Sequence, residues 1–194
     1  PTLTTTGSSY NLALLGSNTN ITGTQAATVF NNTGTLTLGN NASDNLSFAG
    51  GLTATAPSSI SAAGQISTSG LNAINLGDSV AGSATGVTLT GDVVLTTAGG
   101  NLNINGAVMG SAANTQSLTL NATSTGVVNV SSTLGYNPLG NNASLRNLTL
   151  THSHDATFEA AVKADTSVML SNTTAGRTIT FQSNLTTPTL TTTG

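Results

Sequence analysis

The chain has 194 residues, of which 5% are charged, 3% aromatic and 37% hydrophobic, and its net charge is −3. Typical soluble domains carry about 25% charged residues. The three Lys and Arg residues here argue against nucleic acid and against anionic membrane surfaces, since both are bound through basic side chains. Disordered chains combine low hydrophobicity with high net charge, so this composition favours a folded core. There is no cysteine, and no apolar run approaches the ~18 residues of a membrane-spanning helix.

Along the chain, apolar residues alternate with Thr, Ser or Asn. A period of two predicts strands with one buried face. Gly, Asn, Asp and Ser separate the short runs, as turns require. The clearest runs, in chain order, are Leu36-Thr-Leu38, Leu46-Ser-Phe48, Leu102-Asn-Ile104, Leu118-Thr-Leu120, Val128-Asn-Val130, Leu148-Thr-Leu150 and Ile179-Thr-Phe181.

One segment, from Thr157 to Asp165, is the best candidate for a helix. It has no capping residues, and its apolar residues continue the alternation of the strands. The chain is therefore predicted to be all-β.

A shorter repeat of strand, turn and strand recurs within the chain. Segments beginning at Thr35, Ser117 and Asn147 align with apolar residues in the same columns. These columns hold Leu36, Leu118 and Leu148; then Leu38, Leu120 and Leu150; then Leu46, Val128 and Phe158; and last Phe48, Val130 and the smaller Ala160. We expect the aligned apolar residues, Leu38, Leu120, Leu150 and Phe158 among them, to be buried.

Recurrence with imperfect length predicts the stacked coils of a parallel β-helix, a solenoid whose length variation lies in its turns. Coils of about 20–30 residues would give roughly six to nine coils in the chain. The richness in Asn and Thr also fits in-register ladders of like side chains. An antiparallel β-sandwich is the alternative, because it too shows short strands with regular turn signals.

The aligned segments LTLNATSTGVVNV and LTLTHSHDATFEAAV resemble the degenerate repeats of filamentous-haemagglutinin-like large exoproteins and autotransporter adhesins. The resemblance covers most of the chain in style, without a diagnostic motif. It implies a secreted bacterial surface protein with a right-handed parallel β-helix as its shaft. The long repeat described next departs from the shorter repeats of that family.

The first seven residues of the chain, PTLTTTG, return as its last seven. Residues 1–7 and 188–194 are identical, and the two copies lie 187 residues apart. The interpretation is that residues 1–187 are one unit of a tandem array and residues 188–194 begin the next unit. Such an array builds length, as a fibre or stalk does.

The two histidines are the first candidates for a functional site. His152 and His154 share a face if the segment is extended, and Asp155 and Glu159 follow, so a metal could find ligands there. Both histidines fall in the turn after Leu150, which favours ordinary exposed positions, and no metal or cofactor site is predicted. The basic residues Arg146, Lys163 and Arg177, with Asp155, Glu159 and Asp165 nearby, could form a docking patch or a few surface ion pairs.

Catalysis by a β-helical polysaccharide lyase or hydrolase would need grouped carboxylates, often with calcium or a basic residue. The acids of the first half, Asp44, Asp78 and Asp92, have no basic residue within fifty positions, and the chain has no Trp as a sugar platform. No catalytic, cofactor-binding or metal-binding residues are predicted, and the chain is not expected to be an enzyme.

These observations predict a structural shaft segment of an extracellular, repetitive bacterial surface fibre that supports adhesion, aggregation or biofilm structure. Its expected partners are head-to-tail copies of the same unit, without nucleic acid or membrane insertion. The alternatives are a module that binds glycans or cells and a β-helical polysaccharide-degrading enzyme. The expected location is extracellular, at the cell surface.

Overall fold

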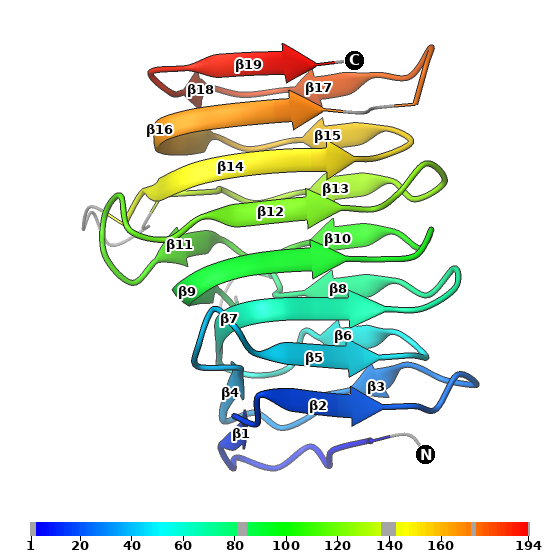
Figure 1. Ribbon diagram of the computed structural model, residues 1–194. Coiled ribbons are helices and arrows are strands. Elements are labelled where there is room, and N and C mark those ends of the chain that lie inside the picture. The colour runs from blue at the N-terminus through cyan, green and yellow to red at the C-terminus, as the bar shows by residue number, and fades with distance from the viewer. Residues whose placement is uncertain (1–2, 81–84, 137–142, 172–173, 194) are drawn as a thin grey trace.

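The chain winds as a single right-handed β-solenoid. A computed structural model describes residues 3–80, 85–136, 143–171 and 174–193, and this part of the chain contains strands and turns but no helix. As the chain climbs in Figure 1, the near strands run to the right and the far strands to the left, so the coil is right-handed. Every strand pair is parallel, for example β12 with β14 and β10 with β13. The parallel pairing confirms the predicted β-helix and excludes the antiparallel sandwich.

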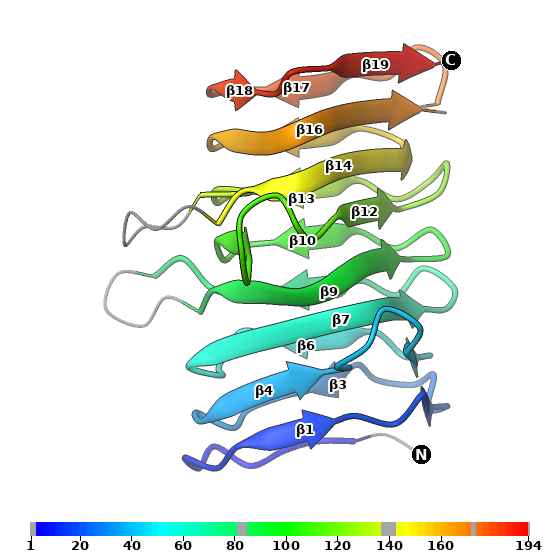
Figure 2. The same ribbon diagram turned by 60° about the vertical axis from the view of Figure 1, so that its left-hand side comes forward.

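Each coil has three sides, which we number in chain order. Side 1 holds β1 (Leu12–Leu14), β4 (Thr35–Leu38), β11 (Val108–Gly110) and β18 (Leu185–Thr186). Side 2 holds β2 (Asn18–Ile21), β5 (Asn45–Phe48), β12 (Leu118–Asn121) and β19 (Leu190–Thr193). Four strands bend around the corner from side 1 to side 2: β7 (Ser59–Thr68), β9 (Val87–Thr96), β14 (Leu145–His152) and β16 (Val162–Ser171). These bent strands join the two sides into one continuous sheet (Figure 2).

Side 3 is a separate sheet of seven strands in the described part of the chain. It lies on the far side of the solenoid in Figure 1. Its members are β3 (Thr28–Val29), β6 (Leu52–Ala54), β8 (Ile74–Leu76), β10 (Leu102–Ile104), β13 (Val128–Val130), β15 (Ala156–Phe158) and β17 (Ile179–Phe181). One strand for each coil gives seven coils, within the predicted six to nine.

Coil length varies although the stacking is in register. On side 3, Leu52 lies beside Ile74, 22 residues on, and Ile74 lies beside Leu102, 28 residues on. Both values fall in the predicted range. At the coil spacing of about 4.8 Å, seven coils rise about 34 Å along the axis.

Apolar residues that point inward stack in columns and form the core. On side 2, one column runs through Leu46, Ile66, Leu95, Leu120, Leu150 and Leu170. Leu38, Leu120, Leu150 and Phe158 are each fully buried, as predicted. Burying a side chain of this size contributes about 1.5–3 kcal/mol. Because each column residue is covered by the coils below and above it, a coil is stabilised mainly by its neighbours.

The predicted alignment of the short repeat is correct in one step and wrong in another. Leu118 does stack on Leu148 on side 2. Leu36 lies on side 1, beside Ile60, so it does not belong in their column. Phe158 stacks on Val130, where the alignment had placed it with Val128. The physical reason is that every side shows the same alternation, whereas the corners that separate the sides carry no repeated signal.

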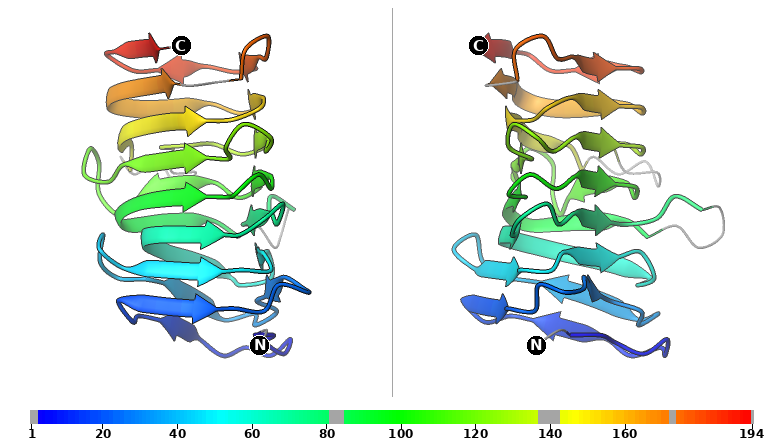
Figure 3. Two further views of the ribbon diagram at one scale, coloured as in Figure 1. Left: turned by 45° about the vertical axis from the view of Figure 1, so that its right-hand side comes forward. Right: turned by 90° about the vertical axis from the view of Figure 1, so that its right-hand side faces the viewer.

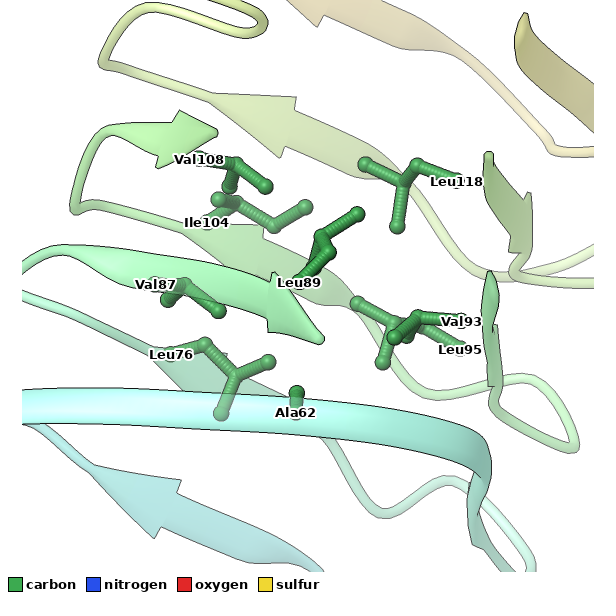
Figure 4. A pocket seen from close by; sticks show the side chains of 9 residues that line it. All are labelled: Ala62, Leu76, Val87, Leu89, Val93, Leu95, Ile104, Val108 and Leu118. Carbon is green, nitrogen blue, oxygen red and sulfur yellow. The ribbon is translucent and has the colours of Figure 1, made fainter. Parts of the chain in front are cut away.

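Packing is less complete at one place in the core. A small void of about 10 Å³ lies in the third to fifth coils, and Figure 4 shows the side chains that line it. Ala62 borders it, although the equivalent positions in the coils below and above are Leu38 and Leu89. The void is apolar and barely the size of one water, so it stays dry. Its lining residues are Ala62, Leu76, Val87, Leu89, Val93, Leu95, Ile104, Val108 and Leu118.

The corner between sides 1 and 2 either bends a strand or admits a loop. Loops lead from β4 to β5 and from β11 to β12 (Figure 2). In the first of these, the buried carboxylate of Asp44 accepts hydrogen bonds from the amides of Asn40 (2.9 Å) and Asn41 (3.1 Å). In the next coil Gly64 has a φ of 86°, and a Cβ there would lie 2.4 Å from the carbonyl oxygen of Asp44.

Candidate functional site

A ladder of polar side chains, which we call the Asn ladder, runs along the outer surface of side 3 through Thr53, Asn75, Asn103 and Asn129. The Nδ2 of Asn103 donates to Oδ1 of Asn75 (2.7 Å), and the Nδ2 of Asn129 donates to Oδ1 of Asn103 (2.9 Å). At the lower end, the Nδ2 of Asn75 donates to Oγ1 of Thr53 (3.2 Å). These residues are the centres of three-residue strands, between two inward apolar residues each. The ladder confirms that like polar side chains stack in register.

The Asn ladder presents three neutral amides and one hydroxyl. An amide has two donor hydrogens and two acceptor lone pairs, so each Asn keeps part of its capacity after bonding along the axis. The four ladder residues carry no titratable group. The surface can therefore form hydrogen bonds with water or hydroxyl groups, but it has no group for acid–base or nucleophilic catalysis.

A second polar array follows the corner between sides 1 and 2. We call Asp92, Ser117, Arg146, Asn147 and Ser167 the corner ridge. The carboxylate of Asp92 accepts from the amide of Ser117 (2.8 Å), and the side chain of Asn147 donates to Oγ of Ser117 (3.2 Å). Ser167 then donates to Oδ1 of Asn147 (2.9 Å). The ridge thus joins four successive coils, from the fourth to the seventh.

An ion pair reinforces the corner ridge. The Nη2 of Arg146 lies 2.8 Å from Oδ2 of Asp92, and the Nε of Arg146 donates to Oγ of Ser117 (3.1 Å). The two charged side chains are 42% and 46% exposed, so the pair contributes about 0–1 kcal/mol. Sequence reasoning missed it because 54 residues separate the partners, and only the stacking of alternate coils brings them together.

The charged residues of the last quarter do not form one patch. On β16, the Nζ of Lys163 lies 3.7 Å from Oδ1 of Asp165, and the Oγ of Ser144 donates a hydrogen bond to Oδ2 of Asp165. Arg177 precedes side 3 and acts electrostatically on Asp155 instead. Of the two expectations, local ion pairs describe these residues: Arg146 pairs with Asp92 and Lys163 with Asp165, while Arg177 lies near Asp155.

Asp155 lies between β14 and β15, at the corner from side 2 to side 3. Both oxygens of its carboxylate have polar partners. The amide of Thr178 donates to its Oδ1 (3.0 Å), and Nδ1 of His154 lies 2.8 Å from its Oδ2. The hydrogen bond from the Thr178 amide is the main cause that lowers the pKa of Asp155; desolvation opposes it, and the nearby His154 and Arg177 lower the pKa further. His152 ends β14 and is half-buried, as is His154. Within the residues that the structure describes, no group of three or more His, Cys, Asp or Glu could hold a metal ion.

The remaining acids are scattered. Asp44 is engaged in its turn, and Glu159 is exposed after β15. Asp78 borders an open hollow of about 440 Å³. It is the one titratable residue in the lining, so this hollow has no pair of groups for general acid–base chemistry. The lining residues are Asp78, Ser79, Gly86, Ala107, Met109, Ser132 and Thr133.

The two ends of the solenoid differ from its sides. In the first coil, Leu12, Leu14 and Ile21 point inward but are only partly buried, and the same is true of Ile179 and Phe181 near the other end. Leu190, in the last strand, is 52% exposed. Figure 3 shows the first and last coils lying open at opposite ends of the stack. Among the described residues, β1 and β2 pair only with β4 and β5, so one edge of each is unpaired.

No family model, no curated protein and no solved structure matches the chain. In the described part of the chain no helix is long and apolar enough to cross a membrane.

Proposed function

We propose that this chain is a structural shaft segment of an extracellular bacterial surface fibre, which supports adhesion, aggregation or biofilm structure. The observation that carries the proposal is the contrast between ends and sides. The ends have unpaired strand edges and incompletely covered core columns, whereas the sides have polar ladders bonded within the molecule. Unpaired edges are templates for further strands, so such a unit is suited to extension along its axis.

The proposed partners are head-to-tail copies of the same unit, either in one chain or as separate chains. The sequence repeat at residues 1–7 and 188–194 supports this partner. The near absence of charge on the sides supports an inert surface, since long-range attraction to charged ligands requires a concentrated charge. An extracellular location rests on the resemblance to secreted repeat proteins and remains part of the proposal.

The proposal is tested by electron microscopy of the protein at increasing concentration and of a chain that contains several units in tandem. We expect thin filaments or rods whose length grows with the number of units. Separate globules joined by flexible linkers in the tandem chain would contradict the shaft. A single unit that stays monomeric at every concentration would contradict assembly from separate chains and leave the array within one chain.

A second candidate is a module that binds glycans or cells through the corner ridge. The observation that favours it is the half-exposed pair of Arg146 and Asp92 beside the amide of Asn147, because charged groups and amides recognise sugar hydroxyls through directed hydrogen bonds. Glycan-array binding by the native protein, lost in Arg146→Ala and kept in Arg177→Ala, would support this function. A polysaccharide-degrading enzyme has no comparable support, and an assay for release of reducing ends tests it directly.

A further inference from the structure

The two copies of the repeated segment have the same inward face. In the first copy, Leu3 packs against the core and Thr5 is 7% exposed. In the second copy, Leu190 and Thr192 lie above the inward residues Val168 and Leu170. Leu190 and Thr192 correspond to Leu3 and Thr5, since 187 residues separate the copies. The segment therefore presents the same two residues to the core at both places.

The two copies nevertheless lie on different sides of the coil. Thr4 forms a bridge with Val29 of β3, which places the first copy on side 3. Its counterpart Thr191 pairs with Met169 of β16, which places the second copy on side 2. From side 3 before the first coil to side 2 after the seventh, the chain makes seven full coils and two thirds of another.

The copies also use opposite edges of the strand. In β19, the carbonyl of Thr189 accepts from the amide of Val168 (2.9 Å), so the residues that bond to the coil below are Thr189, Thr191 and Thr193. Alternate residues of a parallel strand bond to opposite neighbours, so Thr192 directs its amide upward. In the first copy the equivalent residue, Thr5, donates its amide upward to the carbonyl of Val29 (3.2 Å). The second copy is thus paired only with the strand below it, β16, and the first copy only with the strand above it, β3.

We propose that consecutive units join through this shared segment into one continuous solenoid, in which each unit is rotated by a third of a turn about the axis relative to the last. This inference rests on the proposed function as a shaft. Superposing the two copies places one strand between β16 of the first unit and β3 of the second. Side 3 of the second unit then continues side 2 of the first. The shared strand is paired on both of its edges, with β16 below and β3 above.

The same arrangement covers the exposed core at both ends. Side 1 of the second unit continues side 3 of the first, so β1 lies on β17. Leu12 and Leu14 of the second unit then cover Ile179 and Phe181, with apolar residues in alternate positions on both strands. In continuous numbering Leu12 of the second unit is residue 199, so it pairs 20 residues beyond Ile179. Within the unit, Leu148 and Val168 also pair at a separation of 20.

The rotation has a measurable consequence for the fibre. Seven and two-thirds coils at about 4.8 Å give an axial rise of about 37 Å for each unit. Because the sides exchange places at every junction, the Asn ladder faces three directions in turn, and the surface pattern returns after three units. Fibre diffraction or helical reconstruction should therefore find a screw of about 37 Å and about 120°.

A two-unit chain, residues 1–194 followed by residues 8–194, tests the rotation by cross-linking. The protein has no native cysteine. One variant carries Thr180→Cys in the first unit and Ala13→Cys in the second. These outward residues are the centres of β17 and β1, and we expect them to be neighbours at the coil spacing, within the Cα separation of 4.4–6.8 Å that a disulfide requires.

The matched control variant carries Thr186→Cys in place of Thr180→Cys. Thr186 is the outward residue of β18 on side 1, and it would be the neighbour of Ala13 if side 1 continued side 1 without rotation. Rapid oxidation of the first variant alone supports the proposal. Cross-linking of the control, or of neither variant in a chain that melts as one unit, overturns the rotation and leaves the shaft intact. Two independent melting transitions would instead contradict the shaft.

Discussion

Side 3 and the corner between sides 1 and 2 belong to the same seven coils, but they accommodate sequence variation differently. On side 3 the register continues without a shift through the described strand pairs, from Thr28 to Phe181. At the corner the register shifts between Ala62 and Gly64 and again between Leu145 and Asn147. Register shifts therefore fall where a strand bends, and the sheet that carries the Asn ladder stays regular.

Charge is distributed in the same way. The side chains of the Asn ladder are neutral, whereas the corner has the ion pair of Arg146 with Asp92 and, in the second coil, the buried Asp44. The half-exposed corner keeps the charges of Arg146 and Asp92 in contact with water, at little cost, whereas the buried Asp44 accepts hydrogen bonds from amides of its own loop. A flat sheet surface would place charges of the same sign in stacked, neighbouring positions. The comparison indicates that the corners are the part of this fold that tolerates new chemistry.

The largest expected effect is the loss of a core column. Leu120→Asp should cost several kcal/mol, because it places an unpaired charge in a dry interior, and the protein should be largely unfolded. Thr119→Asp, the outward neighbour on the same strand, should change stability by less than about 0.5 kcal/mol. Urea denaturation of both variants measures the difference. Equal midpoints would contradict the inward register of side 2.

A smaller effect is expected at the corner itself. Gly64→Ala should destabilise the protein by about 2–3 kcal/mol, because the residue has a positive φ and its Cβ would meet the backbone of the neighbouring coil. Gly176→Ala is the matched control: its φ is also positive, at 76°, but nothing lies within 4 Å of the added Cβ, so about 1 kcal/mol is expected. Thermal melting distinguishes them. Equal losses would show that the close approach of the coils at this corner has no energetic weight.

The Asn ladder provides a graded test on side 3. Asn103→Ala removes two side-chain hydrogen bonds and should cost about 1–2 kcal/mol, whereas Asn129→Ala removes one and should cost about half as much. Chemical denaturation of the two variants gives both values. An equal or reversed order would mean that the ladder does not stabilise the stack.

The ion pair of the corner ridge should matter least among these contacts. Asp92→Asn is expected to cost no more than about 1 kcal/mol, and the loss should shrink as salt is raised. A double-mutant cycle of Asp92→Asn with Arg146→Gln isolates the pair from the hydrogen bonds that each residue keeps. A coupling energy well above that value, or one insensitive to salt, would show that the ridge is a more rigid network than its exposure suggests.

The smallest expected effect concerns pH. The pKa of Asp155 in the folded protein lies below its ordinary value of 3.8. A carboxyl with a lowered pKa stabilises the fold above the pKa of the unfolded chain, and this contribution is lost as the pH falls through the folded value. Stability should therefore decline below about pH 4, and Asp155→Asn should flatten part of that decline. Identical acid profiles for the two proteins would remove Asp155 as a cause.

The sequence predicted the strands and the buried residues because these depend on a local pattern. Leu38 and Phe158 alternate with polar neighbours, and a period of two is visible without knowledge of the fold. The corners were not predictable in this way. Whether Leu36 and Leu118 share a side depends on where the chain bends, and Ala62, Gly64 and their neighbours mark a bend only through contacts with other coils.

The two polar arrays also differ in how far the sequence predicts them. A ladder of Asn side chains could be expected, because Asn75, Asn103 and Asn129 each stand between two apolar residues. The ridge could not, since Asp92 and Arg146 differ in their local sequence and meet only after two coils have been stacked. Prediction of such a pair requires the length of every intervening turn, which a single sequence does not specify.

The unequal coil lengths on a constant spacing have a mechanical meaning. A coil of 22 to 28 residues occupies about 4.8 Å of the axis but about 70–90 Å when drawn out at about 3.3 Å per residue. Pulling on the ends would load the coils one after another, because each is bonded only to its neighbours. A single coil that peels away would then lengthen the molecule by more than ten times its own height without breaking a covalent bond. The stacked solenoid can therefore extend under tension in steps, each of which releases the chain length of one coil.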